Sequence, residues 1–157
     1  MSTLRDELIN GPLAAQIAPL LVSADDVSIA AILNNKNIPV VGTINVNEFA
    51  IWAAVTGMRA AIQAQADNAL SPLRSIALTL LDLLQGNLHP ESLNLGLPGN
   101  VAMLNAWVNA GLLSQENHDN LIALATNQIS RAQQLGISIT DVDIRREIWN
   151  DDGTRKL

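Results

Sequence analysis

The central part of this chain is almost free of charge. Between Phe49 and Leu113 only five residues are charged: Arg59, Asp67, Arg74, Asp82 and Glu91. The other residues are mainly Ala, Leu, Ile, Val, Asn and Gly, in spacings that are typical of helices. A helix that faces solvent usually keeps one side charged. We therefore expect these central helices to bury more than one face, in a core or against other proteins.

The composition predicts one folded domain. The chain has 157 residues, of which 48% are hydrophobic and 15% are charged. Globular proteins carry about 25% charged residues, so polarity here comes mainly from neutral side chains. A chain of this length suits a single core. We predict an all-α fold, a compact single-domain bundle over residues 1–157, with residues 151–157 as a surface tail.

Charge and aromatic content argue against nucleic acid as a partner. The formal net charge is −6, and aromatic residues make up 3% of the chain. Neither a basic footprint nor a set of stacking rings is therefore expected. Cys is absent, which excludes disulfides and thiolate chemistry.

One uncharged run, residues 92–115, is long enough to span a bilayer. It contains Pro98, three Gly and four Asn. The backbone and amide groups of these residues would lack hydrogen-bond partners in lipid, so we expect no membrane span. The N-terminus has charges of both signs and no apolar run after them, which is unlike a signal peptide.

Breakers and capping residues divide the chain into about seven to eight short helices. Asn45 and Glu48 resemble a capping box, and Ser114 and Thr140 suit N-caps. Gly57 lies inside an expected helix, where it costs about 1 kcal/mol relative to Ala, so we predict a close helix contact there. The main helices are expected at residues 12–22, 46–66, 71–84, 101–110, 115–126 and 128–135, with a last helix after Thr140.

Residues 37–44 form the most strand-like segment. β-branched residues dominate it, but Pro39 limits it to an edge strand or an extended connection. A short segment, Ile137–Ile139, is a candidate partner for Val40 and Val41. This extended segment is the only strand content that we predict.

Catalytic signatures are missing from the sequence. His118 is followed by Asp119 and lies near Glu116, so an acid–base or metal role is one interpretation. A surface His near a helix start is the simpler interpretation. His89 has no paired His or Cys at metal-ligand spacing. We therefore predict no catalytic residue, no metal and no cofactor.

The remaining candidates are residues that could contact another protein. The loop at residues 92–100 is uncharged, and the C-terminal region combines a Trp with neighbouring Arg residues, which is common at interfaces. The alternatives are that the Trp belongs to the core and that the Arg residues lie on a solvated, salt-bridged face. The protein-interface candidates are Leu93, Leu95, Leu97, Trp107, Trp149, Arg145 and Arg146.

Four short segments carry a resemblance to a known group of proteins. They are Gly11-Pro-Leu-Ala14, Leu33-Asn-Asn-Lys-Asn-Ile-Pro-Val-Val-Gly42, Ile129-Ser-Arg-Ala-Gln-Gln-Leu-Gly136 and Asp141-Val142. In these segments the chain resembles small helical proteins encoded in the virion structural gene clusters of tailed bacteriophages. The resemblance implies a structural or assembly role in the phage particle, at the tail or its fibres. It carries over no functional residue.

These observations lead to one main hypothesis and two alternatives. We expect a non-enzymatic virion component, made in the host cytoplasm, that binds larger tail, fibre or neck proteins and copies of itself. An assembly factor or chaperone that is absent from the mature particle is the first alternative. A small hydrolase that uses His118 with nearby carboxylates is the second. The main hypothesis includes no small-molecule substrate, nucleic acid or membrane partner.

Overall fold

The computed structural model describes residues 3–86 and 91–156, which contain ten helices and four short strands. Helices account for 61% of these residues, so the prediction of a mainly helical protein is confirmed. The strictly all-α assignment is wrong, because two small two-stranded sheets are also present. The chain divides into two compact units. Unit 1 comprises Met1–Ile38 and Gln128–Leu157, and unit 2 comprises Pro39–Asn127.

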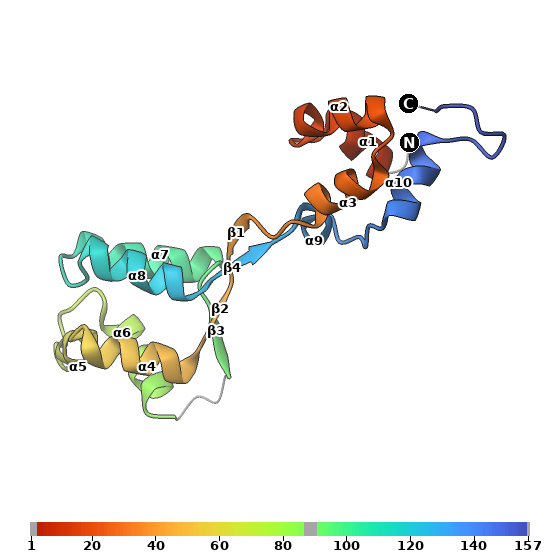
Figure 1. Cartoon of the computed structure of the whole chain (residues 1–157). Helices are drawn as coiled ribbons and strands as arrows, with labels where there is room; N and C mark the ends of the chain where they lie inside the picture. Colours follow the sequence, from red (N-terminus) through yellow and green to blue (C-terminus); the bar gives the residue numbers. More distant parts are fainter. Residues whose placement is uncertain (1–2, 87–90, 157) are drawn as a thin grey trace. The chain divides into compact units, whose positions relative to one another are not determined.

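Unit 1 is built from both ends of the chain, coloured red to orange and blue in Figure 1. Its apolar side chains form a core that includes Ile17, Ile29, Leu33, Ile144 and Ile148, each 0% exposed. α10 contacts both α1 and α3, so the C-terminal helix completes a core that the N-terminal helices begin. Its helices are α1 (Thr3–Asn10), α2 (Ala14–Ser23), α3 (Asp26–Asn34), α9 (Arg131–Gln134) and α10 (Asp141–Ile148).

Side-chain caps set where several of these helices begin. The Thr140 hydroxyl accepts a hydrogen bond from the Asp143 backbone N–H, and the Asp143 carboxylate accepts one from the Thr140 backbone N–H. This capping box confirms the predicted start of α10. The hydrogen bonds from the hydroxyl and backbone of Thr140 hold the pKa of Asp143 below its usual value. Ser130 and Gln133 form a second capping box at α9.

A buried ion pair joins α1 to α9. The Glu7 side chain is 5% exposed, and Arg131 donates Nε to Oε1 at 2.8 Å and Nη2 to Oε2 at 2.7 Å. The hydrogen bond to Glu7 raises the pKa of Arg131. A Cβ at Gly11 would collide with the carboxylate and the carbonyl of Glu7. Gly11 therefore does more than end α1, because it also leaves room for the buried carboxylate.

Unit 2 contains the charge-poor middle of the chain. Figure 1 shows α7 and α8 side by side, over a layer made by α4, α5 and α6. The core between them includes the stacked rings of Phe49 and Trp52, whose centroids are 5.6 Å apart, and the fully buried Trp107. Its elements are β2 (Thr43–Asn45), α4 (Val46–Val55), α5 (Met58–Asp67), α6 (Arg74–Leu84), β3 (Ser92–Asn94), α7 (Pro98–Asn109) and α8 (Gln115–Leu124).

The strands are short and pair between distant parts of the sequence. β2 and β3 are antiparallel, with Ile44 opposite Leu93. β1 (Ile38–Val41) pairs with β4 (Thr126–Ile129) where the chain enters and leaves unit 2. The extended character predicted for residues 37–44 is therefore confirmed. The predicted pairing with Ile137–Ile139 is wrong, since β4 is the partner of β1 and residues 137–139 are not a strand.

The helix predicted at residues 46–66 is two helices, because the chain turns at Gly57. The φ angle of Gly57 is +75°, a left-handed value that glycine adopts without steric cost. α4 ends at Val55, and α5 begins at Met58. No described atom lies within 4 Å of a Cβ built at Gly57, so the predicted close helix contact is also wrong. This glycine acts through its backbone.

The region after α8 also differs from the prediction. Residues predicted as the start of a helix at 128–135 belong partly to β4, and the helix α9 covers only Arg131–Gln134.

At the C-terminus Trp149 forms a β-bridge with Arg155, and Arg5 donates a hydrogen bond to the Lys156 carbonyl at 3.0 Å. No helix in the described part of the chain is long and apolar enough to cross a membrane. The prediction of one domain with a surface tail stays a prediction.

Candidate protein-interaction site

The loop predicted to contact a partner mainly serves the core of unit 2. Leu95 is 0% exposed, and its backbone N–H donates to the Gly42 carbonyl at 2.8 Å. Leu93 is half-buried against the same core. A Cβ at Gly96 would collide with the Val41 carbonyl, so the loop and β1 approach closely here. Leu97, directly before α7, is the exposed exception at 52%.

Trp107 is also unavailable to a partner. It lies on α7 and is 0% exposed, within the main cluster of buried residues of unit 2. Leu95 and Trp107 therefore cannot contact another protein in this conformation, because both side chains are enclosed by their own unit. Hydrophobic character identified them, but a single sequence does not distinguish an apolar residue of the core from one at an interface.

The C-terminal candidates lie on or beside α10. Trp149 is half-buried against the core of unit 1, which matches the core alternative. Arg145 donates Nε to Asp26 at 2.7 Å, and this hydrogen bond raises the pKa of Arg145. Arg146 is exposed, and its carbonyl accepts a hydrogen bond from the Lys156 ammonium at 2.7 Å. None of these residues contributes to an exposed apolar surface.

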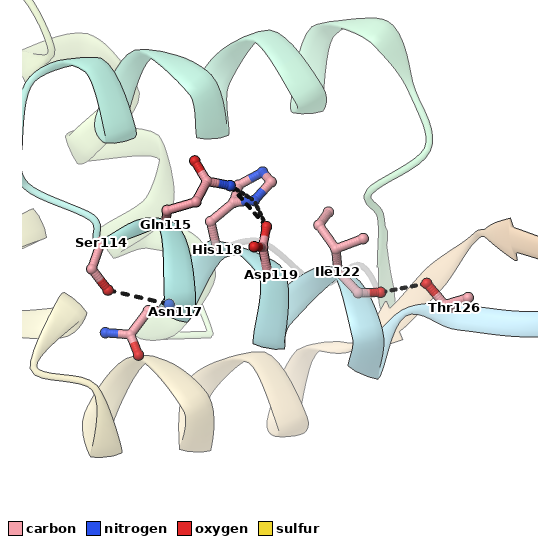
Figure 2. Close-up of polar contacts among 7 residues, drawn as sticks. All are labelled: Ser114, Gln115, Asn117, His118, Asp119, Ile122 and Thr126. Carbon is pink, nitrogen blue, oxygen red and sulfur yellow. Dashed lines mark hydrogen bonds and ion pairs between the residues drawn. The ribbon is translucent and has the colours of Figure 1, made fainter.

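His118 takes part in a local network on the surface of α8 (Figure 2). Its Nδ1 lies 2.9 Å from Asp119 Oδ1 and 3.2 Å from Gln115 Nε2, and Gln115 Nε2 also donates to Asp119 at 2.8 Å. The hydrogen bond with His118, followed by that from Gln115, holds the pKa of Asp119 below its usual value. All three residues lie within one turn of the helix, as in many solvated helix faces.

A catalytic arrangement would need more than this network. Ser114 accepts a hydrogen bond from the Asn117 backbone N–H at 3.2 Å, which is the predicted N-cap. The Ser114 hydroxyl therefore caps the helix, and the His118 imidazole makes no hydrogen bond with that hydroxyl. His89, the other imidazole, lies outside the described residues. Among the residues that are described, no group of three or more His, Cys, Asp or Glu could hold a metal ion.

An apolar groove of unit 2 lies between α4 and α8. Its volume is about 670 Å³. Three large apolar side chains in it are open to solvent: Ile51 at 65%, Val55 at 82% and Leu124 at 56%. Trp52, only 6% exposed, joins the groove to the core. The groove is lined by Glu48, Ile51, Trp52, Val55, Thr56, Asn117, Asn120 and Leu124.

The two helices expose this surface because α4 is apolar on more than one side. Phe49, Trp52 and Ala53 face the core, while Ile51 and Val55 form a second stripe four residues apart. Figure 2 shows α8 between α7 and α4, with His118 on the α7 side and Asn117 on the α4 side. The sequence signal for this site was the surplus of apolar residues on α4 beyond one buried stripe.

Glu48 is the one charged residue among the described residues that line the groove. Glu48 is the only charged residue on α4, and Glu116 and Asp119 are the only formally charged residues on α8. Asn45 caps α4 by accepting from the Asn47 N–H at 2.8 Å, but Glu48 does not complete the predicted capping box. No hydrogen bond or ion pair joins the Glu48 carboxylate to another described residue. This carboxylate lies exposed at the edge of the groove.

A second groove lies between α6 and α7, with a volume of about 540 Å³. Its lining includes Ser75, Thr79, Gly99 and Asn100. The apolar residues of its lining are buried, half-buried or, at Ala102, small, so no large apolar side chain is open to solvent in it. The α4–α8 groove is therefore the better candidate for contact with another protein.

Comparisons with known proteins add no further assignment to this site. No family model, curated protein or solved structure matches the chain.

Proposed function

We propose that the protein is a non-enzymatic structural or adaptor component of a tailed-phage virion, associated with the tail or its fibres, that binds larger virion proteins. The resemblance of its N- and C-terminal segments to phage virion proteins supports the phage context. The observation that carries the binding role is the α4–α8 groove, where Ile51, Val55 and Leu124 remain exposed. Exposed apolar residues that gather in one groove are typical of a surface used by a partner.

An adaptor role also agrees with the polar sites of the chain. The Glu7–Arg131 pair, the capping boxes and the Asp119 network all stabilise the chain itself. The compact single-domain bundle expected from the sequence stays part of this proposal.

The test is the protein content of particles purified from the phage that encodes the chain. Mass spectrometry of particles banded by density should detect the protein at a fixed ratio to a tail protein. Tail-less heads purified from the same lysate are the control and should lack it. Absence from complete particles would overturn the virion role. Presence only in assembly intermediates would instead support the alternative of an assembly factor or chaperone.

A further inference from the structure

We propose that the α4–α8 groove receives one amphipathic helix of a partner protein, with apolar residues on one face and Lys or Arg beside them. This inference rests on the adaptor role proposed above and names the chemistry of its partner. It begins from the dimensions of the groove. α4 and α8 each have ten residues, which corresponds to about 15 Å of helix. A partner segment of about three turns would fill that length.

The positions of the groove residues suit a helix as the occupant. Glu48, Ile51 and Val55 recur along α4 at spacings of three and four residues, and Asn117, Asn120 and Leu124 do the same along α8. Two such stripes form the walls of a groove that accepts apolar anchors spaced i, i+3 or i+4, and i+7. Ile51, Val55 and Leu124 would cover those anchors, and Trp52 would form the floor.

The negative charge of unit 2 indicates that the partner helix is cationic. Glu48 is the one charged residue in the described lining of the groove, and neither groove helix carries a Lys or Arg. The other carboxylates of α8 are Glu116 and Asp119, and Asp119 is hydrogen-bonded to His118 and Gln115. The two Arg residues of unit 2 lie elsewhere, Arg59 on α5 and Arg74 on α6. Unit 2 has six acidic residues and two Arg, so its formal charge is −4. A cationic helix is attracted to such a surface, and an acidic one is repelled.

The same charges disfavour a second copy of this chain as the occupant. Two copies joined through this groove would each contribute a Glu48 carboxylate to the interface and no cation from the groove helices. Like charges facing each other across an interface cost several kcal/mol. Glu48 strengthens the case for a cationic partner, because its carboxylate has no ion-pair or hydrogen-bond partner among the described residues.

The probe is a fluorescently labelled 14-residue peptide made only of Leu and Lys in a helical amphipathic pattern. A Leu/Glu peptide of the same pattern and a scrambled Leu/Lys peptide are its controls. Fluorescence anisotropy with the full chain should detect binding of the Leu/Lys helix, weakening as salt is raised. The Leu/Glu peptide should not bind, and the scrambled peptide should bind about tenfold more weakly.

Variants locate the contact on the protein. Ile51→Asn and Val55→Asn should each weaken binding by about tenfold or more, as expected for anchors of an interface. Leu70→Asn is the matched control, because Leu70 is 93% exposed in the same unit and outside the groove. It should change the dissociation constant less than about twofold. Glu48→Gln should weaken binding about threefold and reduce its salt dependence, whereas Asp67→Asn, on α5, should not.

Three outcomes of the binding experiments would overturn the inference, and one change of oligomeric state would do so too. The three binding outcomes are equal binding of the Leu/Glu peptide, unchanged binding by the two groove variants, and equal weakening by Leu70→Asn. Loss of a dimer on Val55→Asn would also overturn it, since a second copy would then occupy the groove. Circular dichroism of each variant identifies any loss of folding. The particle analysis is independent, so a failed groove experiment leaves the virion role intact, and absence from particles leaves peptide binding intact.

Discussion

The Glu7–Arg131 pair allows a quantitative test of what holds unit 1 together. Arg131→Ala would leave the Glu7 carboxylate, 5% exposed, without its cation. Two charge-assisted hydrogen bonds are lost, at 2.7 and 2.8 Å, and each contributes about 1.5–3 kcal/mol. Removing one partner of a buried pair costs about 3–5 kcal/mol, so the two estimates agree. We expect the free energy of unfolding of unit 1 to fall by about 3–5 kcal/mol.

Arg145→Ala is the matched control in the same unit. Arg145 also bonds a carboxylate far away in sequence, Asp26, but its side chain is 58% exposed. An exposed pair of this kind contributes about 1 kcal/mol or less. Arg131 is 19% exposed and bonds Glu7 through two nitrogens, whereas Arg145 is 58% exposed and bonds Asp26 through one. The difference between the two Arg variants therefore measures the effect of enclosing the guanidinium in a two-bond pair, with the residue type and the truncation held constant.

Urea unfolding followed by NMR of fluorotryptophan-labelled protein is the assay. Trp149 reports on unit 1, while Trp52 and Trp107 report on unit 2. At an m value of about 1–2 kcal/mol/M, the Arg131→Ala change moves the midpoint of the Trp149 transition by about 1.5–5 M. The Glu7→Met/Arg131→Met double variant should recover most of that loss, because it leaves no unpaired buried charge. Equal midpoints for Arg131→Ala and Arg145→Ala would refute the reasoning.

Three smaller changes test local features. Gly57→Ala places a side chain at a left-handed φ of +75° and should cost about 1–2 kcal/mol in urea unfolding of unit 2. Gly99→Ala is its control, since Gly99 has an ordinary φ and open space around it, and should cost nothing. Ser114→Ala removes the cap of α8 and should lower the thermal stability of unit 2 by about 1 kcal/mol. For Asp143 the folded pKa lies below the unfolded value of 3.8, so its contribution is present above pH 3.8 and is lost as the pH falls further. Acid unfolding below about pH 4 should therefore be less steep for Asp143→Asn, and equal steepness would contradict the role of the capping bond with Thr140.

Local chemistry explains which parts of the fold the sequence could predict. The caps at Ser114 and Thr140 were predictable because each is decided within three residues. The turn at Gly57 was not, because glycine tolerates both a helix interior and a left-handed turn. β4 was missed because its partner, β1, lies nearly the whole of unit 2 away in sequence.

The candidate site, too, was predictable only as far as local sequence determines it. The surplus of apolar residues in the middle of the chain predicted helices that bury more than one face, and on α4 the second apolar stripe is exposed in this chain. Sequence alone assigned the contact surface to Leu95 and Trp107, which the core encloses, and not to Ile51 and Val55. Which apolar residues of α4 are buried depends on which face of the helix packs against its neighbours. This is a tertiary property that the periodicity of the sequence does not contain.

The chain order of the two units has a consequence for how the protein folds. Unit 1 is made of two segments, and unit 2, about 90 residues, lies between them in sequence. Closing a flexible loop of that length costs about 4 kcal/mol of chain entropy, from (3/2)RT ln n. Once unit 2 has folded, the pairing of β1 with β4 holds its ends together, and unit 1 no longer bears this cost. Entropy therefore favours a pathway in which the inserted unit folds first and then brings α1–α3 to α9 and α10.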